Sequence, residues 1–389
     1  MIGMVRRLWR ELPWDGQGLG RPVHPTLSPL SRWASREWRR ERASSLHGAV
    51  GLASRLLWCI AAVCKAMRFA GLVEGASFAG LYRDCLQTGA TPLEAHVWRS
   101  LHATPHPLPA RAAALLQSRL GAPEAHRLLA DKLETATILS GAGILGPELI
   151  GMVERGGPVA LPLLTAVHRP LFLKPRHGHG HRHAFSLVPN GGEWLIDGRI
   201  VSEPDLHARL QRVVSEDDLL IQERLTAVSD LADLAVAGRA PVLRLVTARM
   251  PGAEPFLHSA LLTVGVPDRN PAHFLEGAVH VPVDGATGRM LRGLALSRPD
   301  ERLERLPWNA SVLTGRPIPD FDRAVEAALT AMRAVLPLPL IHWDIVLTES
   351  GPIFLEGNSS GNWIIASLPG LEGQGACDLA ELLAHWRPS

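Results

Sequence analysis

The sequence is poor in cysteine and has no long apolar run. Its four cysteines show neither CxxC spacing nor the context of a small secreted domain, which excludes a disulfide framework and favours reduced core thiols. The longest apolar run of the N-terminal part, Leu56 to Cys64, is far shorter than the roughly 20 residues that cross a bilayer. No signal peptide is evident. We therefore expect a cytoplasmic protein without a membrane span.

The sequence also lacks an excess of either charge. Forty basic residues against 38 acidic ones give a net charge of +2, which offers no case for a nucleic-acid partner. Lysine is scarce, because Lys65, Lys132 and Lys174 are the only lysines among the forty. A lysine presents a compact charge to a phosphate oxygen at sites where the broad arginine fork is too large. The scarcity singles out candidate phosphate ligands, although codon bias also explains an arginine excess and chance explains Lys65.

The length of 389 residues predicts two or three subdomains. We expect residues 1 to about 120 to form a mainly helical region, which has no recognisable chemistry, and a further helix over 127–141. Strand-like segments dominate the rest. The pattern predicts strands at 171–174, 184–188, 194–196, 219–222, 242–248 and 257–264, and helices at 203–214 and 320–335.

The most informative segment covers residues 341–358. Two apolar, β-rich runs flank Glu349-Ser350-Gly351, which predicts a β-hairpin with a three-residue loop. Glycine suits the last position of such a loop, because that position is left-handed. Across this loop we expect Thr348 to pair with Pro352.

That pairing places two carboxylates directly opposite each other. Asp344 then faces Glu356 with Cβ atoms roughly 5 Å apart. The two charges repel unless a cation lies between them. Asn358 shares the face of Glu356 and adds a neutral oxygen, so the three residues predict a Mg²⁺ site. A surface hairpin that happens to carry acids is the alternative.

A glycine-containing segment follows the predicted strand that ends at Lys174. Gly178 and Gly180 allow backbone N–H groups to approach phosphate oxygens, which predicts a flap that closes over a nucleotide. The segment has neither a Walker loop nor a dinucleotide-binding fingerprint. Histidines at positions 177, 179, 181 and 183 leave a transition-metal tract as the alternative.

A third segment, residues 217–225, is an apolar strand that runs directly into polar residues. Its end is placed to present backbone donors and acceptors to an adenine edge. An exposed residue at a strand terminus is the alternative interpretation of Glu223.

Taken in order along the chain, these segments resemble the ATP-grasp superfamily over about residues 125–389. Residues 242–247 and 343–358 more narrowly resemble the sugar-transfer associated ATP-grasp family, which is similar to α-L-glutamate ligase-like proteins. The resemblance implies an α+β fold in which two lobes clasp ATP. It divides the chain into a mainly helical region (1–120), a first lobe with the lysines and the flap (121–225) and a second lobe with the hairpin (226–389).

The resemblance also implies roles for individual residues. Arg244 and Lys174 are the expected catalytic residues, with Arg244 facing the reacting phosphoryl group. The remaining expected contacts are Lys132 and Lys174 on the ATP phosphates, Gly178 and Gly180 in the flap, Gln222, Glu223, Arg224 and Leu225 around the adenine, and Asp344, Glu356 and Asn358 on Mg²⁺. The histidine-rich flap and the segment 267–277 depart from the pattern of the family.

The activity that the resemblance implies is ATP-dependent ligation of a small-molecule carboxylate to an amine, through an acyl phosphate. Such chemistry depends on positioning and charge neutralisation more than on a nucleophilic side chain. Biosynthesis of a peptide-like metabolite or a cell-surface polymer fits this activity. A kinase acting on a small-molecule hydroxyl and a non-catalytic nucleotide-binding protein are the alternatives. The sequence leaves the substrates and the oligomeric state open.

Overall fold

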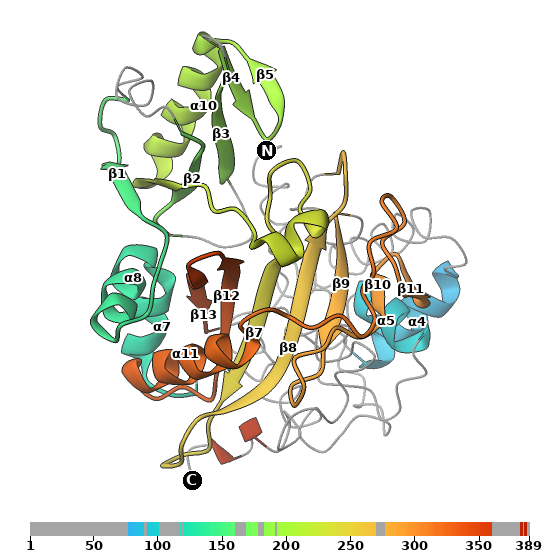
Figure 1. Cartoon of the computed structure of the whole chain (residues 1–389). Coiled ribbons are helices and arrows are strands. Elements are labelled where there is room, and N and C mark those ends of the chain that lie inside the picture. Colours follow the sequence, from blue (N-terminus) through green and yellow to red (C-terminus); the bar gives the residue numbers. More distant parts are fainter. Residues whose placement is uncertain are drawn as a thin grey trace, which may run out of the picture.

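The computed structural model describes residues 77–88, 92–100, 117, 120–159, 169–177, 183–190, 193–269, 277–359, 382–383 and 385–386. Two antiparallel sheets, each accompanied by helices, make up most of this part of the chain (Figure 1). The predicted α+β class is therefore confirmed. None of the helices in the described ranges combines the length and the apolar character that a membrane span requires.

The first lobe is built on a six-stranded sheet with the order β1-β6-β2-β3-β4-β5. Helix α10 (Glu203–Glu216) covers one face, where Leu206 and Leu210 join the same apolar cluster as Leu171 and Phe185. Ser202 caps this helix, since its hydroxyl oxygen accepts from the Asp205 amide at 3.3 Å. The strands are β1 (Leu149–Val153), β2 (Leu171–Pro175), β3 (Phe185–Asn190), β4 (Glu193–Ile196), β5 (Arg199–Val201) and β6 (Leu219–Glu223).

The second lobe is built on a seven-stranded sheet with the order β11-β10-β9-β8-β7-β12-β13. Side chains alternate between its faces. In β7, Leu243 and Leu245 enter the apolar core, while Arg244 lies on the opposite face. The strands are β7 (Val242–Ala248), β8 (Phe256–Gly265), β9 (Ala278–Val283), β10 (Gly293–Ala295), β11 (Arg298–Leu303), β12 (Leu340–Thr348) and β13 (Gly351–Asn358).

Helix α11 (Phe321–Ala334) closes the apolar core of the second sheet. Its buried residues recur every three or four positions, so they form one face of the helix, and Ala324, Ala328 and Met332 join the core. The short 3-10 helix η2 (Ser229–Leu234) adds Leu231 and Leu234 to the same core. The helices predicted over 203–214 and 320–335 are therefore present as α10 and α11.

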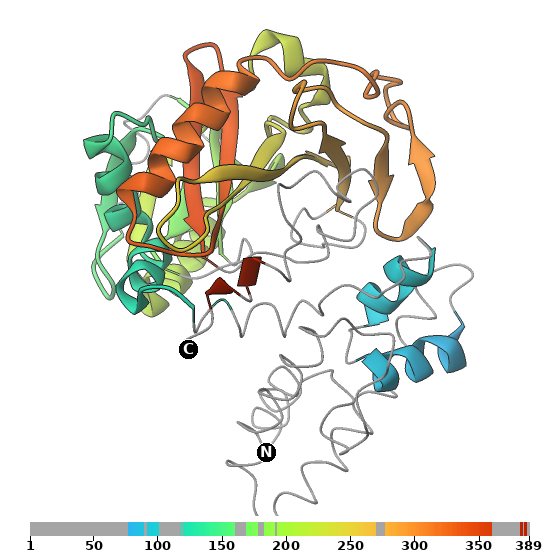
Figure 2. The same ribbon diagram turned by 90° about the horizontal axis from the view of Figure 1, so that it is seen from below.

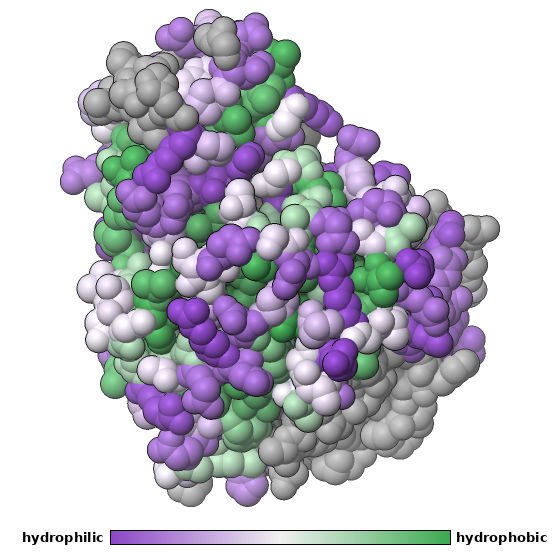
Figure 3. Space-filling model, in the orientation of Figure 1, coloured by the Kyte–Doolittle hydropathy of each residue, from purple (hydrophilic) through white to green (hydrophobic). Residues whose placement is uncertain are grey.

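Of the predicted N-terminal helical region, two helices lie in the described ranges, α4 (Phe78–Thr88) and α5 (Pro92–Ser100). They contact each other, and α5 also contacts β11 at the edge of the second sheet (Figure 2). Residues 1–76 lie outside the described part of the chain. Over the described part of the face in Figure 3, hydrophilic and hydrophobic residues are interspersed.

The single helix predicted over 127–141 is wrong, because the chain forms two helices there. Helix α7 (Pro123–Ala130) ends at Asp131, which has an extended backbone, and α8 (Lys132–Gly141) begins at the next residue. The Asp131 carboxylate accepts from the amides of Leu133 and Glu134 at 2.9 and 3.2 Å. An aspartate that caps the second helix in this way cannot also continue the first.

Helices α7 and α8 precede the first lobe in sequence but pack on the second. Leu129 and Leu139 belong to the core of the seven-stranded sheet, and both helices contact β13. In Figure 1 they lie beside β12, β13 and α11, below the first lobe. We therefore count α7 and α8 with the second lobe in space.

The predicted hairpin is present, but its predicted loop is wrong. Thr348 pairs with Gly351 and not with Pro352, so the turn has two residues. Gly351 has a φ of +107°, as its place at the end of the turn requires. A β-bulge at Leu355 then inserts one residue into β13 and restores the predicted pairing further along, with Asp344 opposite Glu356.

Candidate functional site

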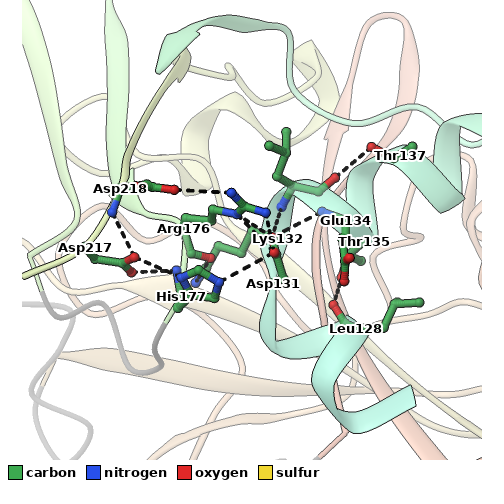
Figure 4. A network of polar contacts seen from close by, with 11 residues as sticks. Leu128, Asp131, Lys132, Glu134, Thr135, Thr137, Arg176, His177, Asp217 and Asp218 are labelled. Atoms are coloured by element: carbon green, nitrogen blue, oxygen red, sulfur yellow. Dashed lines mark hydrogen bonds and ion pairs between the residues drawn. The ribbon is translucent and has the colours of Figure 1, made fainter. Parts of the chain in front are cut away.

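The two candidate phosphate lysines lie on different lobes and converge on the acidic hairpin. Lys174, near the end of β2, donates from Nζ to the Leu355 carbonyl at 3.1 Å. Lys132, the first residue of α8, donates from Nζ to the Arg176 carbonyl at 3.4 Å (Figure 4). Both ammonium groups lie within electrostatic reach of Glu356. Side chains separated by more than 200 residues therefore share one site.

Burial lowers the pKa of Lys174 to about 8. Glu356 and Asp344 oppose this shift, while the second cation, Lys132, adds to it. Burial also lowers the pKa of Lys132, again against the attraction of Glu356. A buried and a half-buried ammonium group that repel each other favour a polyanionic ligand, because its charge offsets both desolvation and mutual repulsion.

This shift makes a testable contribution to stability. Below pH 8, Lys174 is charged in the folded and unfolded states, and the folded state bears the cost of burying the charge. Between about pH 8 and 10.5 the folded state loses its proton first, so this contribution to stability rises with pH. We expect the melting temperature of wild type to rise relative to that of Lys174→Met between pH 7 and 10. Differential scanning fluorimetry measures the difference between the two melting temperatures. A difference that does not change with pH would contradict the lowered pKa of Lys174.

Asp344 and Arg244 form a bidentate ion pair on the polar face of the second sheet. Nε and one terminal nitrogen of Arg244 each donate to one oxygen of Asp344 at 2.7 Å. The two residues are direct neighbours across β12 and β7. Although burial alone would lower the pKa of Arg244, Asp344 and Glu356 raise it. The predicted role of Arg244 toward a phosphoryl group stays a prediction, since its fork is directed at Asp344.

The metal-binding role of Asp344, Glu356 and Asn358 stays a prediction, and the chemistry of their side chains is compatible with a hard cation. Glu356 lies opposite Asp344, and Asn358 donates from its side-chain nitrogen to Glu356 Oε1 at 3.2 Å. Their oxygen donors match the preference of Mg²⁺. The ion pair with Arg244 uses one position on each Asp344 oxygen, and a carboxylate has about four. Within the described ranges, no cluster of three or more His, Cys, Asp or Glu side chains has the arrangement of a metal site.

Gly357 lies between two of these ligands and touches a buried aromatic ring. A Cβ added there would overlap Trp343, with Cε3 at 2.8 Å, and would approach Leu129 at 3.1 Å. Trp343 is fully buried, and its indole N–H donates to Thr247 Oγ1 at 3.0 Å. The ring is therefore held on two sides, and its packing against the backbone of residue 357 requires glycine there.

We expect Gly357→Ala to destabilise the protein by about 1–3 kcal/mol, as overpacking of a core does, and to weaken Mg²⁺-dependent nucleotide binding. Gly151→Ala in β1 is the matched control, because its Cβ would meet the nearest atom, on Ile221, at 3.9 Å. Urea unfolding and calorimetric titration of Mg·ATP report the two effects. Equal behaviour of the two variants would show that the hairpin adjusts without cost.

The predicted adenine segment, residues 222–225, begins in the last two residues of β6 and continues beyond the strand. Gln222 is buried within the strand, and the Glu223 carboxylate accepts from the Glu148 amide at 3.0 Å. Arg224 donates through its amide to the Pro170 carbonyl at 3.1 Å and through its side chain to Ser186 Oγ at 3.4 Å. Glu223 therefore holds Glu148, the residue that directly precedes β1, in place. Adenine binding by residues 222–225 stays a prediction.

The predicted flap glycines, Gly178 and Gly180, lie outside the described residues. His177, which precedes them, is anchored to Asp217 through its amide at 2.7 Å and its ring Nδ1 at 2.9 Å. His183, which follows them, lies 3.6 Å from Glu216. Both described ends of the segment therefore contact acidic residues at the C-terminal end of α10.

Sequence reasoning missed the ionic network beside Lys132. Figure 4 shows Arg176 between Asp131 and Asp218, with His177 and Asp217 next to it. The sequence contained one signal for part of this network. Asp131 is followed three residues later by Glu134, a pattern that is typical of a helix start. Nothing in the sequence indicates that Arg176 contacts this helix start.

Comparison with known proteins places these observations in a family. No curated protein matches the chain. Among solved structures, the chain is similar to VanG D-Ala:D-Ser ligase from Enterococcus faecalis, with 14% identity, a TM-score of 0.43 and coverage of 68% of this chain and 63% of VanG. It is also similar to D-alanine–D-alanine ligase from Bacillus anthracis complexed with ATP (12% identity, TM-score 0.38, 71% and 72% coverage). D-cycloserine synthetase DcsG gives 18% identity, a TM-score of 0.37 and 66% and 69% coverage.

The sequence itself matches the family described as sugar-transfer associated ATP-grasp over residues 111–376. This range holds every candidate site residue named above, and it confirms the resemblance found in the sequence. Because the match extends over more than half of its length, the chain belongs to the sugar-transfer associated ATP-grasp family.

Proposed function

We propose that this protein is an ATP-dependent ligase that joins a small-molecule carboxylate to an amine. One observation carries the proposal: Lys174 of the first lobe donates to the Leu355 carbonyl of the hairpin, and its ammonium group interacts electrostatically with the carboxylate of Glu356. Cations for phosphate binding and oxygen ligands for a metal thus face each other between two lobes. Binding of Mg·ATP requires both kinds of group at one place.

Each group has a separate task in this proposal. Lys132 and Lys174 bind phosphate oxygens of ATP, and burial strengthens these contacts because little water screens them. Asp344, Glu356 and Asn358 would hold Mg²⁺, which would neutralise charge on the phosphates. Arg244 orients Asp344 through its bidentate pair. The site therefore positions reactants and disperses charge without a nucleophilic side chain.

The proposed reaction has two steps. A carboxylate oxygen of the substrate attacks the γ-phosphorus, the bond to the β,γ-bridging oxygen breaks, and ADP leaves. The amine nitrogen then attacks the acyl carbon, the carbon–oxygen bond to phosphate breaks, and the nitrogen loses a proton. Exclusion of water protects the acyl phosphate between the two steps.

The test is phosphate release from Mg·ATP by the purified protein against a panel of carboxylates, each with and without a panel of amines. Mass spectrometry identifies the products. Release that requires both partners, together with an amide product, supports the ligase. A stable phosphorylated product without amine would move the assignment to a kinase. Mg·ATP binding without turnover on any pair would contradict the ligase and leave nucleotide binding.

A further inference from the structure

Arg176 uses its main chain to connect the two lobes. Its amide donates to the Asp218 carbonyl at 2.9 Å, which fixes it to the start of β6 in the first lobe. Its carbonyl accepts from the Lys132 amide at 3.2 Å and from Lys132 Nζ at 3.4 Å. Residue 176 therefore holds both the backbone and the ammonium group of a candidate phosphate ligand.

The guanidinium group of Arg176 strengthens the same connection. Nε and one terminal nitrogen contact the Asp131 carboxylate at 2.6–3.0 Å, and the other terminal nitrogen contacts Asp218 at 3.2 Å. The Asp131 side chain is only 11% exposed. Although burial would raise the pKa of Asp131, hydrogen bonds from Arg176 and the helix amides lower it to about 2. The ion pair thus persists across the physiological pH range.

This geometry links two lysines that belong to different packing units. Lys132 begins α8, which packs on the second sheet, while Lys174 lies two residues before Arg176 in the first lobe. Asp131 caps α8 and receives Arg176 at the same time. We propose that Arg176 is a positioning residue that fixes Lys132 relative to Lys174, so that the two ammonium groups bind one polyphosphate. The inference rests on the proposed function, since it takes both lysines as phosphate ligands.

The chemistry of the contact requires arginine. A planar fork presents two parallel donors to Asp131 while its third nitrogen reaches Asp218, and an ammonium group cannot make both contacts in this geometry. Lysine at position 176 keeps the charge and the main-chain contacts but loses the fork. Arg176→Lys therefore isolates the positioning effect from the charge.

The matched variants are Arg176→Lys, Asp131→Asn and, as control, Arg127→Gln. Asparagine still caps a helix, so Asp131→Asn keeps the cap of α8 while it removes the carboxylate charge that contacts Arg176 and His177 and that favours the charged form of Lys132. Arg127 lies on α7 in an exposed pair with Glu124, with 77% of its side chain exposed. The probes are Mg·ATP and adenosine, measured by isothermal titration calorimetry, with the melting temperature measured in parallel.

We expect Arg176→Lys and Asp131→Asn each to weaken Mg·ATP binding by about tenfold, on the scale of one lost charge-assisted hydrogen bond. Adenosine affinity stays unchanged, because adenosine has no phosphate, and the double variant is no weaker than the worse single one. A lowered melting temperature with wild-type Mg·ATP affinity would overturn the positioning role. Failure of wild type itself to bind Mg·ATP would instead overturn the proposed function. If Arg176→Lys does not fold, Asp131→Asn decides.

Discussion

Glu356→Gln is expected to reduce Mg²⁺-dependent ATP turnover by at least ~100-fold, on the scale of losing one preorganised charged group in an active site, while the melting temperature stays close to wild type. The substitution removes a candidate metal ligand, and it also removes the strongest attraction that keeps Lys174 charged, so the pKa of Lys174 falls further. Glutamine keeps the size of the side chain and its hydrogen bond with Asn358. Turnover and calorimetric titration with Mg²⁺ at fixed ATP report the two losses.

Asp344→Asn is the informative comparison, because it should lose both activity and stability. Asparagine leaves Arg244 without its bidentate partner on a buried strand, and breaking one side of a buried ion pair costs about 3–5 kcal/mol. Urea unfolding measures this cost. Full activity in either variant would contradict the metal assignment, and an unchanged stability of Asp344→Asn would show that Arg244 finds another partner.

Lys174→Arg is expected to lose at least ~100-fold in turnover although it keeps the charge. Lys174 is 6% exposed and its Nζ contacts the Leu355 carbonyl at 3.1 Å, so a wider guanidinium fork must displace the hairpin or leave the site. Lys174→Met should fail as well, because it removes the charge. The two variants together separate the requirement for size from the requirement for charge.

The control for this prediction is Arg209→Lys in α10, where the side chain is 40% exposed and its guanidinium lies over the Phe185 ring, in the first lobe. It should retain wild-type turnover. Steady-state phosphate release and the KM for ATP distinguish a lost phosphate contact from a slower chemical step. Wild-type activity in Lys174→Arg would show that the scarcity of lysine in this sequence is unrelated to phosphate binding.

The hairpin shows which features of the structure the local sequence pattern predicts. Two apolar, β-rich runs around a glycine turn correctly predicted two paired strands with Asp344 opposite Glu356. The loop length was nevertheless wrong by one residue, and the bulge at Leu355 compensated for the error. The position of a bulge depends on how the strand packs against other parts of the protein. The local sequence pattern does not contain this information.

Other elements were missed for identifiable reasons. The strand 278–283 is buried along its whole length and contains Pro282, so it shows neither the alternation nor the composition of a typical strand. The three-residue strands 199–201 and 293–295 are too short for any periodicity. The break at Asp131 is a capping contact that the apolar pattern of two consecutive helices concealed.

The candidate site was predicted as a set of residue types, and not as a set of contacts. Rarity marked Lys132 and Lys174, and the resemblance placed them near Glu356, with which both interact electrostatically in the structure. The partners of these residues come from distant segments. Arg176 gave no signal of its own, because its importance arises from where α7 and α8 pack.

The bulge at Leu355 also supplies a hydrogen-bond acceptor to Lys174. An extra residue in a strand leaves its backbone groups outside the regular ladder, and here that carbonyl accepts the Lys174 ammonium. The inserted residue thus gives the buried Lys174 ammonium group an oxygen acceptor that belongs to the other lobe. Under the proposed function, a phosphate oxygen would replace this carbonyl, so the ammonium group would exchange one acceptor for another.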